Sequence, residues 1–262
     1  MTSLQVKIHP TSIVQNGAEL GLGVEIGPFS NIGSQVKLGD NVKVHSHAVI
    51  TGKTFIDKNS SIWPFATIGT EPQDLKYCGE NTELICGSDN IFREYSNISL
   101  GTVGGGGITK IGSNNLFMVN SHIAHDCFVG DHCIFANGVS LAGHIEIQDH
   151  VILGGHSACH QFIKVGSYSM IAGGAMVSQD VPPFVLVHGN HAKPKGIHQI
   201  GLARNKFSKN QIADIKQMYK FLYRMNLPLS CAVKMIEENT PDSSMKSLLL
   251  NFLSGCSRGI CR

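Results

Sequence analysis

The residues of this sequence best suited to chemistry are a cluster of histidines between positions 122 and 160. Seven of the thirteen histidines in the chain lie there: His122, His125, His132, His144, His150, His156 and His160. An imidazole titrates near neutral pH and can act as a general base, above all where a carboxylate orients its ring. Asp126 directly follows His125, so this pair is the first candidate for acid–base chemistry.

A six-residue repeat defines the elements that must position these histidines. Apolar residues return at every sixth position from Ile8 to Ile68, resume at Cys86, and run in a shifted phase from Ile111 to Val177. A period of six fits neither a helix nor a simple alternating strand, so it predicts a parallel β-helix of very short strands joined by corners. Glycine often follows the apolar position, where a chain that turns so often is expected to need a residue without a Cβ.

The phase of the repeat also places the histidines. None of the seven occupies an apolar position, so all are expected at corners or on outer faces, where a substrate can reach them. For His132 and His150, the plainer interpretation is a solvated surface side chain.

Two segments interrupt the repeat, at about residues 70–84 and 102–110, and insertions in a solenoid often carry function. The second contains the glycine run 104–107. It lacks the lysine and the strand-to-helix context of a phosphate-binding loop, so we predict a flexible loop there.

The C-terminal part of the chain is predicted to be helical. The hexads end before Pro182 and Pro183, which cannot donate to a continuing ladder. Beyond them, Ser208 with Gln211 predicts a capping box, Ser230 predicts the cap of a second helix, and residues 242–253 predict a third. We therefore expect a β-helix domain over residues 1–186 and an α-helical domain over residues 187–262.

Composition predicts a soluble, cytoplasmic protein. Hydrophobic residues make up 42% and charged residues 15% of the chain, with no apolar run long enough for a membrane span and no secretory signal pattern at residues 1–10. The eight cysteines include no CxxC pair, which favours reduced thiols over disulfides or a zinc site.

Charge gives a weaker indication of partners. A net charge of +2 argues against nucleic acid. Residues 193–224 nevertheless contain eight Lys or Arg and one acidic residue, Asp214. This stretch fits either a docking surface for an acidic partner or a solvated basic helix face.

Six short motifs resemble one family. They are Gln73-Asp74-Leu75-Lys76-Tyr77, His122-Ile123-Ala124-His125-Asp126-Cys127, Leu141-Ala142-Gly143-His144, His160-Gln161-Phe162, Gln179-Asp180-Val181-Pro182-Pro183 and Gly201-Leu202-Ala203-Arg204. Together they resemble the UDP-N-acetylglucosamine O-acyltransferases that start lipid A biosynthesis. The resemblance covers nearly the whole chain and implies a left-handed parallel β-helix with coils of eighteen residues, followed by C-terminal helices.

The resemblance also implies an activity and a site. The family moves a 3-hydroxyacyl group from acyl carrier protein to the 3-position of UDP-N-acetylglucosamine in a homotrimer, without a metal or cofactor and without inserting into a membrane. It implies His125 as the general base, Asp126 as the residue that holds its ring, and the Gly143 N–H as the oxyanion donor. Its implied substrate-binding residues are Gln73, Asp74, Lys76, His122, His144, His160, Gln161 and Arg204.

The inferred coil length leads to two further expectations. Asp126 should lie directly below His144, next to His125. Asn137, Gly155, Gly173 and His191 are spaced by eighteen and should form a bare column closed by His191. Coils about 4.8 Å apart make this column roughly 14 Å long, enough for an acyl chain of about a dozen carbons. A plainer interpretation is that Gly155 and Gly173 are corner glycines.

Several positions depart from the family pattern. Ser99 and Leu100 stand where the family has His-Arg, and His198, Ile200 and Asn205 stand where it has Asn, Glu and Arg. These changes leave open a variant that acylates a 3-amino sugar nucleotide. Two other classes also remain: a non-catalytic paralogue and a metal-dependent hydratase, which builds a three-histidine site on the same fold.

Overall fold

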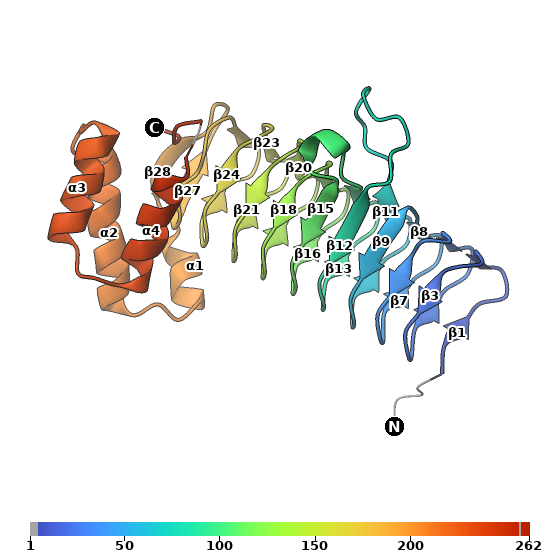
Figure 1. Cartoon of the computed structure of the whole chain (residues 1–262). Coiled ribbons are helices and arrows are strands. Elements are labelled where there is room, and N and C mark those ends of the chain that lie inside the picture. Colours follow the sequence, from blue (N-terminus) through green and yellow to red (C-terminus); the bar gives the residue numbers. More distant parts are fainter. Residues whose placement is uncertain (1–4, 257) are drawn as a thin grey trace.

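The computed structural model describes residues 5–256 and 258–262, and its repeat folds as a parallel β-helix with three sheets (Figure 1). The first sheet contains β1 (Lys7–Ile8), β4 (Glu25–Ile26), β7 (Lys43–Val44), β10 (Ser61–Ile62), β13 (Ile91–Phe92), β16 (Leu116–Phe117), β19 (Ile134–Phe135), β22 (Ile152–Leu153), β25 (Met170–Ile171), β27 (Val185–His188) and β28 (Lys193–Ile197). The second contains β2 (Ile13–Val14), β5 (Asn31–Ile32), β8 (Val49–Ile50), β11 (Thr67–Thr70), β14 (Asn97–Ser99), β17 (His122–Ile123), β20 (Ser140–Leu141), β23 (Ala158–Cys159) and β26 (Met176–Val177). The third contains β3 (Glu19–Leu20), β6 (Lys37–Leu38), β9 (Lys53–Ile56), β12 (Glu83–Cys86), β15 (Ile108–Ile111), β18 (Phe128–Val129), β21 (Glu146–Ile147) and β24 (Lys164–Val165).

The strand register confirms coils of eighteen residues and explains both interruptions of the repeat. Ile123 pairs with Leu141, eighteen residues further on. Across the first insertion Ile68 pairs with Ile98, 30 residues on, and across the second Ile98 pairs with Ile123, 25 residues on. The first insertion therefore adds two whole hexads and keeps the phase, whereas the second adds one hexad and one residue and shifts it.

The glycines after the apolar positions are required for a reason other than the expected turning. With the exception of Gly69 at φ 73°, the left-handed backbone conformation falls on other corner residues, such as Asp126 at φ 59° and His144 at φ 60°. A Cβ on Gly21 would instead lie 2.7 Å from the backbone nitrogen of Asp40, and one on Gly39 2.7 Å from that of Lys58. These glycines are needed because the next coil approaches closely, not because the backbone bends there.

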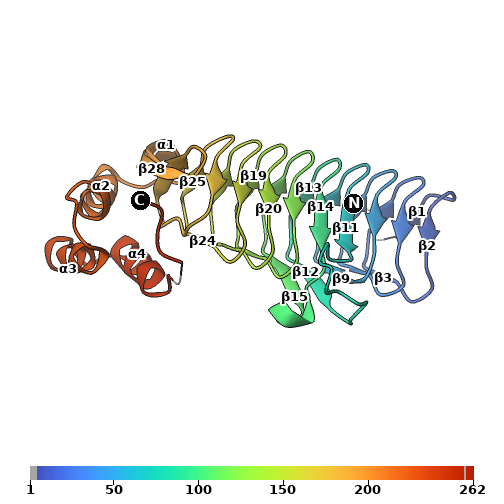
Figure 2. The ribbon, with the colours of Figure 1, turned by 90° about the horizontal axis from the view of Figure 1, so that it is seen from above.

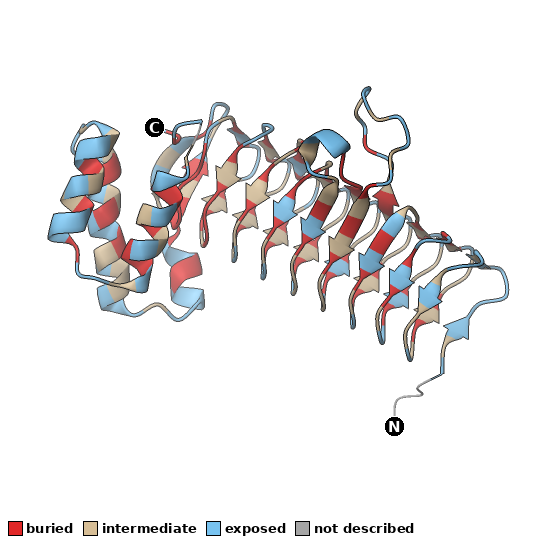
Figure 3. Ribbon diagram, in the orientation of Figure 1, coloured by how far each residue is buried: buried red, intermediate tan, exposed pale blue. Residues whose placement is uncertain are grey.

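The apolar positions fill a narrow core along the axis of the solenoid, which Figure 3 shows as buried segments on successive strands. Phe92, Phe117 and Phe135 stack with ring centroids 5.1 and 4.8 Å apart. Each fully buried aliphatic or aromatic side chain stabilises the fold by about 1.5–3 kcal/mol. Cys86 and Cys159 are buried in this core, and all eight cysteines are free thiols, as predicted.

In the described part of the chain, four helices follow the solenoid: α1 (Gln199–Arg204), α2 (Lys209–Tyr223), α3 (Leu229–Asn239) and α4 (Ser244–Ser254). The capping box of Ser208 and Gln211 at the start of α2 is confirmed. The predicted cap at Ser230 is wrong, because α3 already begins at Leu229 with Pro228 as its N-cap. None of the helices described by the structure is long and apolar enough to cross a membrane.

The junction between solenoid and helices is built from strands. The proposed division at residue 186 falls within β27, which pairs antiparallel with β28 before the first helix begins. Residues 258–262 then return to the end of the solenoid, where the Cys261 N–H donates to the Asp180 carbonyl and the Asp180 N–H donates to the Gly259 carbonyl. Figure 2 shows this C-terminal segment lying between the last coils and the helices.

Candidate active site

His125 and Asp126 form a hydrogen-bonded pair at the corner that follows β17. His125 Nδ1 lies 2.7 Å from Asp126 Oδ2, and the Asp126 side chain is 1% exposed. Because an ionised carboxylate can only accept, Nδ1 carries the proton and Nε2 presents its lone pair. The imidazole is 13% exposed and reaches the surface. This arrangement is that of an oriented general base.

The second insertion holds Asp126 in place. Rather than a flexible loop, it contains the 3-10 helix η1 (Val103–Gly105). The Thr102 N–H donates to Asp126 Oδ1 at 2.8 Å, and Thr102 Oγ1 donates to Oδ2 at 2.6 Å. Sequence reasoning missed Thr102, although the register that pairs Ile98 with Ile123 places the start of the insertion beside Asp126.

The coil above supplies Gly143 and His144, as the inferred coil length predicts. His144 Nδ1 is 3.8 Å from Asp126 Oδ2, too far for a hydrogen bond, and its ring stacks on Phe162 at 4.5 Å. A Cβ on Gly143 would lie 2.5 Å from Cε1 and 2.8 Å from Nε2 of His125. Only glycine therefore leaves room for the imidazole in this position.

The Gly143 N–H is the donor that the family resemblance predicts for the oxyanion. Among the described residues it has no hydrogen-bond partner, whereas the next N–H, that of His144, donates to the His125 carbonyl at 3.0 Å. Because Gly143 packs against the His125 ring, this unpaired N–H is the candidate oxyanion donor of the site.

His122 is fixed on the strand before the pair. Its Nδ1 lies 2.7 Å from Asn97 Oδ1, while Asn97 Nδ2 donates to Thr67 and Thr70, which sets the orientation of the amide. His122 Nδ1 is therefore the donor and Nε2 is free. Burial lowers the pKa of His122, and the nearby His125 lowers it further, so its ring is neutral at physiological pH.

The remaining predicted substrate-binding residues come from three other parts of the chain. Gln73, Asp74 and Lys76 lie in the first insertion, which projects from the same side of the solenoid as η1 (Figures 1 and 2). His160 and Gln161 are exposed one coil above His144, and Arg204 is exposed at the end of α1. No hydrogen bond or ion pair in the described part of the chain joins these six residues to His125 or Asp126.

Two of the other histidines belong to an aromatic column at a different corner. His132 stacks on His150 at 4.8 Å, and His150 stacks on Tyr168 at 4.6 Å. His132 is exposed, which agrees with its interpretation as a solvated surface side chain, whereas His150 is half-buried between its two neighbours in the column.

The predicted column of small residues is correct for three of its four members. Gly155 and Gly173 follow Asn137 in successive coils, and a Cβ on Gly173 would meet only the Gly155 backbone, at 3.3 Å. His191 does not continue this column, because Ile171 pairs with Val187, sixteen residues on, and Gly189 therefore follows Gly173. The last coil is two residues shorter between Val177 and Val181, because Cys159 pairs with Val177, eighteen residues on, whereas Val165 pairs with Val181, sixteen residues on. This shortening displaces His191.

One group of potential metal ligands occurs among the described residues. Ligand atoms of His125, Asp126 and His144 lie within 4.8 Å of one another. However, His125 Nδ1 and both Asp126 oxygens are already used in hydrogen bonds with each other and with Thr102. The group is better explained as a hydrogen-bonded acid–base pair than as a metal site.

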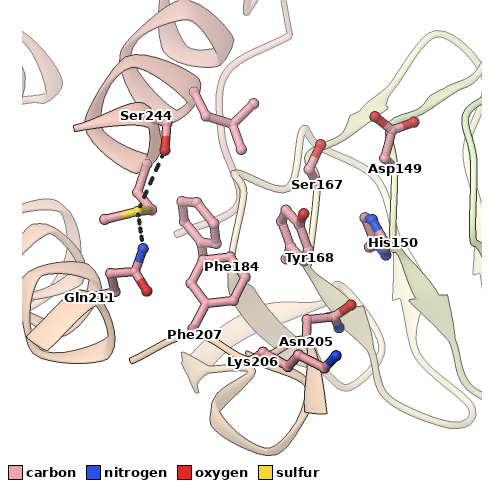
Figure 4. Close-up of a pocket in the computed structure, with 12 residues that line it drawn as sticks. Asp149, His150, Ser167, Tyr168, Phe184, Asn205, Lys206, Phe207, Gln211 and Ser244 are labelled. Atoms are coloured by element: carbon pink, nitrogen blue, oxygen red, sulfur yellow. Dashed lines mark hydrogen bonds between the residues drawn. The ribbon is translucent and has the colours of Figure 1, made fainter. Parts of the chain in front are cut away.

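A cavity of about 430 Å³ lies elsewhere, between a solenoid corner and helices α2 and α4 (Figure 4). Aromatic rings of His150, Tyr168, Phe184 and Phe207 form much of its wall. None of the predicted catalytic or substrate-binding residues lines it, so we assign the chemistry to the His125 corner.

The fold and this site define a hexapeptide-repeat transferase. Residues 23–52 and 108–143 match the bacterial transferase hexapeptide family, and residues 180–261 match the second domain of UDP-N-acetylglucosamine O-acyltransferase. The acyl-(acyl-carrier-protein)–UDP-N-acetylglucosamine O-acyltransferase of Aliarcobacter butzleri is 47% identical over 253 residues, 97% of each chain.

Solved structures of the same family are also similar to this chain. LpxA from Acinetobacter baumannii is 46% identical with a TM-score of 0.95, covering 97% of this chain and 99% of that one. LpxA from Bacteroides fragilis, a UDP-N-acetylglucosamine acyltransferase, is 38% identical with a TM-score of 0.95, covering 97% of this chain and all of that one. The present chain belongs to the UDP-N-acetylglucosamine O-acyltransferase family. The resemblance inferred from the motifs and the left-handed β-helix that it implies are thereby confirmed.

Proposed function

We propose that this protein is an acyltransferase that moves a 3-hydroxyacyl group from acyl carrier protein to the 3-hydroxyl of UDP-N-acetylglucosamine, the first step of lipid A biosynthesis. The observation that carries the proposal is the His125–Asp126 pair, set beside Gly143 in a member of this family. Family membership favours acyl transfer over a metal-dependent hydratase. The intact pair argues against a non-catalytic paralogue.

The geometry supports direct transfer without an acyl-enzyme. His125 Nε2 takes the proton from the sugar 3-hydroxyl as its oxygen attacks the thioester carbonyl. The tetrahedral oxyanion accepts the Gly143 N–H, an interaction worth about 10²–10³ in rate. The intermediate then collapses, the C–S bond breaks, and the imidazolium returns its proton to the thiolate of the carrier. Asp126 stabilises the imidazolium throughout.

We further propose that the complete site forms in a cytoplasmic homotrimer. Asp74 and Lys76 come from the first insertion and Arg204 from the end of α1, and in the described part of one chain none of them has a hydrogen bond or ion pair to His125 or Asp126, so a neighbouring subunit is the simplest source of some substrate contacts. A column of exposed rings along one corner, Phe29, His47, Phe65 and Tyr95, stacks at 5.0–5.2 Å and is suited to a subunit interface.

The residues that depart from the family pattern have uncharged side chains, apart from the titratable imidazole of His198. Leu100 is buried and lines a cavity of about 420 Å³ that residues of the first insertion also line. His198 is 7% exposed, with Nδ1 3.2 Å from the Tyr168 carbonyl. Asn205 donates to the Gly201 carbonyl. Arg204 is therefore our candidate for the diphosphate in this segment.

The decisive experiment offers purified protein a set of 3-hydroxyacyl carrier thioesters with UDP-N-acetylglucosamine or its 3-amino analogue. Mass spectrometry should find the O-acyl ester of the natural sugar as the main product. An amide formed with the 3-amino analogue alone would reassign the acceptor. No product with either sugar would overturn the proposal, and zinc-dependent hydration of carbon dioxide would establish the rival class.

A further inference from the structure

Asp126 is one of the most completely bound side chains in the site. Its Oδ1 accepts the Thr102 N–H, while its Oδ2 accepts both the Thr102 hydroxyl at 2.6 Å and His125 Nδ1 at 2.7 Å. Thr102 is 8% exposed, and the Asp126 side chain is 1% exposed. Water therefore has little access to replace these donors.

Two donors from one residue fix the plane of the carboxylate. An aspartate side chain rotates about two bonds, and a single hydrogen bond leaves one rotation free. The N–H and hydroxyl of Thr102 bind separate oxygens, so together they restrict rotation of the Asp126 side chain about both of its bonds. Because the hydroxyl has one proton and donates it to Oδ2, the remaining direction at that oxygen accepts the Nδ1–H of His125.

The rest of the insertion supports the same contact. The backbone of Gly105 packs against the Asp126 carboxylate so closely that any side chain at Gly105 would overlap it. From the other end of the insertion, Thr109 Oγ1 accepts the Asp126 N–H at 2.8 Å. Thr102, Gly105 and Thr109 thus contact Asp126 from both ends and the middle of the insertion.

We propose that Thr102 is a positioning residue of the acyl transfer, acting through Asp126 to hold the His125 imidazole with its proton on Nδ1 and its basic Nε2 towards the acceptor hydroxyl. The proposal rests on the proposed function, and it assigns a role in catalysis to the second insertion. The insertion buries the carboxylate and binds it, and thereby converts an adjacent His-Asp pair into an oriented base.

Thr102→Val tests the proposal because valine keeps the shape and the backbone N–H but removes the hydroxyl. We expect kcat to fall by about tenfold or more, as when a group that orients a metal-binding side chain is lost. KM for both substrates should stay within twofold of wild type. Oδ2 would then interact with His125 alone and stabilise the imidazolium more. The acidic limb of the pH profile of kcat/KM should therefore move to higher pH. Thr102→Ser should restore most of the activity and the wild-type profile.

Thr54→Val is the matched control. It alters a buried threonine outside the insertion, whose hydroxyl donates to the Thr51 carbonyl at 2.7 Å. It should lower the thermal midpoint and leave the pH profile in place. If Thr102→Val keeps kcat within twofold and the wild-type pH profile, or if it raises KM alone, Thr102 is not a positioning residue.

A measurement independent of turnover separates this proposal from the proposed function. Nitrogen-15 NMR of histidine-labelled protein reports which ring nitrogen of His125 is protonated, with His125→Gln to assign the signal. Wild type should show a single Nδ1–H tautomer, and Thr102→Val a mixture or exchange broadening. Identical spectra would overturn the positioning role even if the enzyme uses a different substrate.

Discussion

At the scale of single residues, the site depends on a backbone conformation that lets two neighbours in sequence meet. Adjacent side chains in a strand point to opposite faces. His125 and Asp126 nevertheless hydrogen-bond, because Asp126 adopts φ 59° at the corner. Aspartate tolerates this conformation better than most residues. The same corner position in the next two coils holds His144 and Phe162, whose rings stack above the pair.

We predict that His125→Ala lowers kcat by about 10²–10⁴, the usual loss for a general base. Binding of the sugar nucleotide and the assembly state should be unchanged, because the ring is not part of the buried core. Turnover with saturating substrates, nucleotide titration and analytical ultracentrifugation check these points. Retention of more than half of the wild-type kcat would show that another group is the base.

At the scale of elements, the coil of eighteen residues determines which side chains form columns. Asn137, Gly155 and Gly173 share one corner in three successive coils, and neither glycine has a left-handed φ. A Cβ would lie 3.4 Å from the Asn137 carbonyl oxygen at Gly155 and 3.3 Å from the Gly155 carbonyl oxygen at Gly173, tight contacts that a small backbone shift would relieve. Both positions could therefore accept a side chain. The absence of a side chain at these two positions is thus better explained by a group that binds against them than by the backbone conformation. This favours an acyl groove over the interpretation as corner glycines.

Gly173→Met should block this groove and shift the preference towards donors a few carbons shorter, with little loss of rate on the short donor. Gly173→Ala, which adds only a Cβ 3.3 Å from the Gly155 carbonyl, is the graded control and should shift the preference less. Competition between thioesters of mixed length measures the effect. An unaltered product distribution for the methionine variant would remove Gly173 from the groove.

At the scale of the whole molecule, the basic residues between 193 and 224 form an exposed surface. All eight Lys and Arg side chains in this stretch are exposed, and they extend from β28 to the end of α2. Such a surface steers an acidic partner by long-range attraction that salt screens. We propose it as the docking surface for acyl carrier protein.

Replacing Lys206 and Lys209 together by Glu should raise KM for the carrier thioester and weaken its dependence on salt, with kcat little changed. Lys234→Glu on α3 makes the same kind of charge change outside the stretch and serves as the control. Initial rates at low and high ionic strength distinguish the variants. An unchanged KM at low salt would rule out this surface.

Acid should weaken the whole fold in a defined window. Burial lowers the pKa of His45, His122, His150 and His198 below the ordinary value of 6.5. The unfolded chain therefore takes up protons before the folded one does, so stability is full above pH 6.5 and is lost as pH falls through the lower folded values. We expect the thermal midpoint to drop by several degrees between pH 7.5 and 5.5, and by less in His198→Gln. Equal midpoints at both pH values would contradict this origin.

Much of this architecture could be predicted from the sequence, because a solenoid repeats one local rule. The period of six places every inward residue, and an insertion of whole hexads keeps that phase while one extra residue shifts it. Motifs such as His122 to Cys127 indicated the family. The His125–Asp126 pair could be predicted because the two residues are adjacent in sequence. The Ser208 capping box was also predictable, since its interactions span only four residues.

Other features depend on contacts that no local pattern contains. Thr102 binds Asp126 across 24 residues of sequence. Glycines of the repeat such as Gly21 and Gly39 are required by the close backbone of the next coil, and the displacement of His191 follows from the coil that is shortened between Val177 and Val181. A period can show which residues share a column, but only packing decides which groups touch. The tertiary structure therefore determined how the base is held, whereas the sequence by itself determined which residue the base is expected to be.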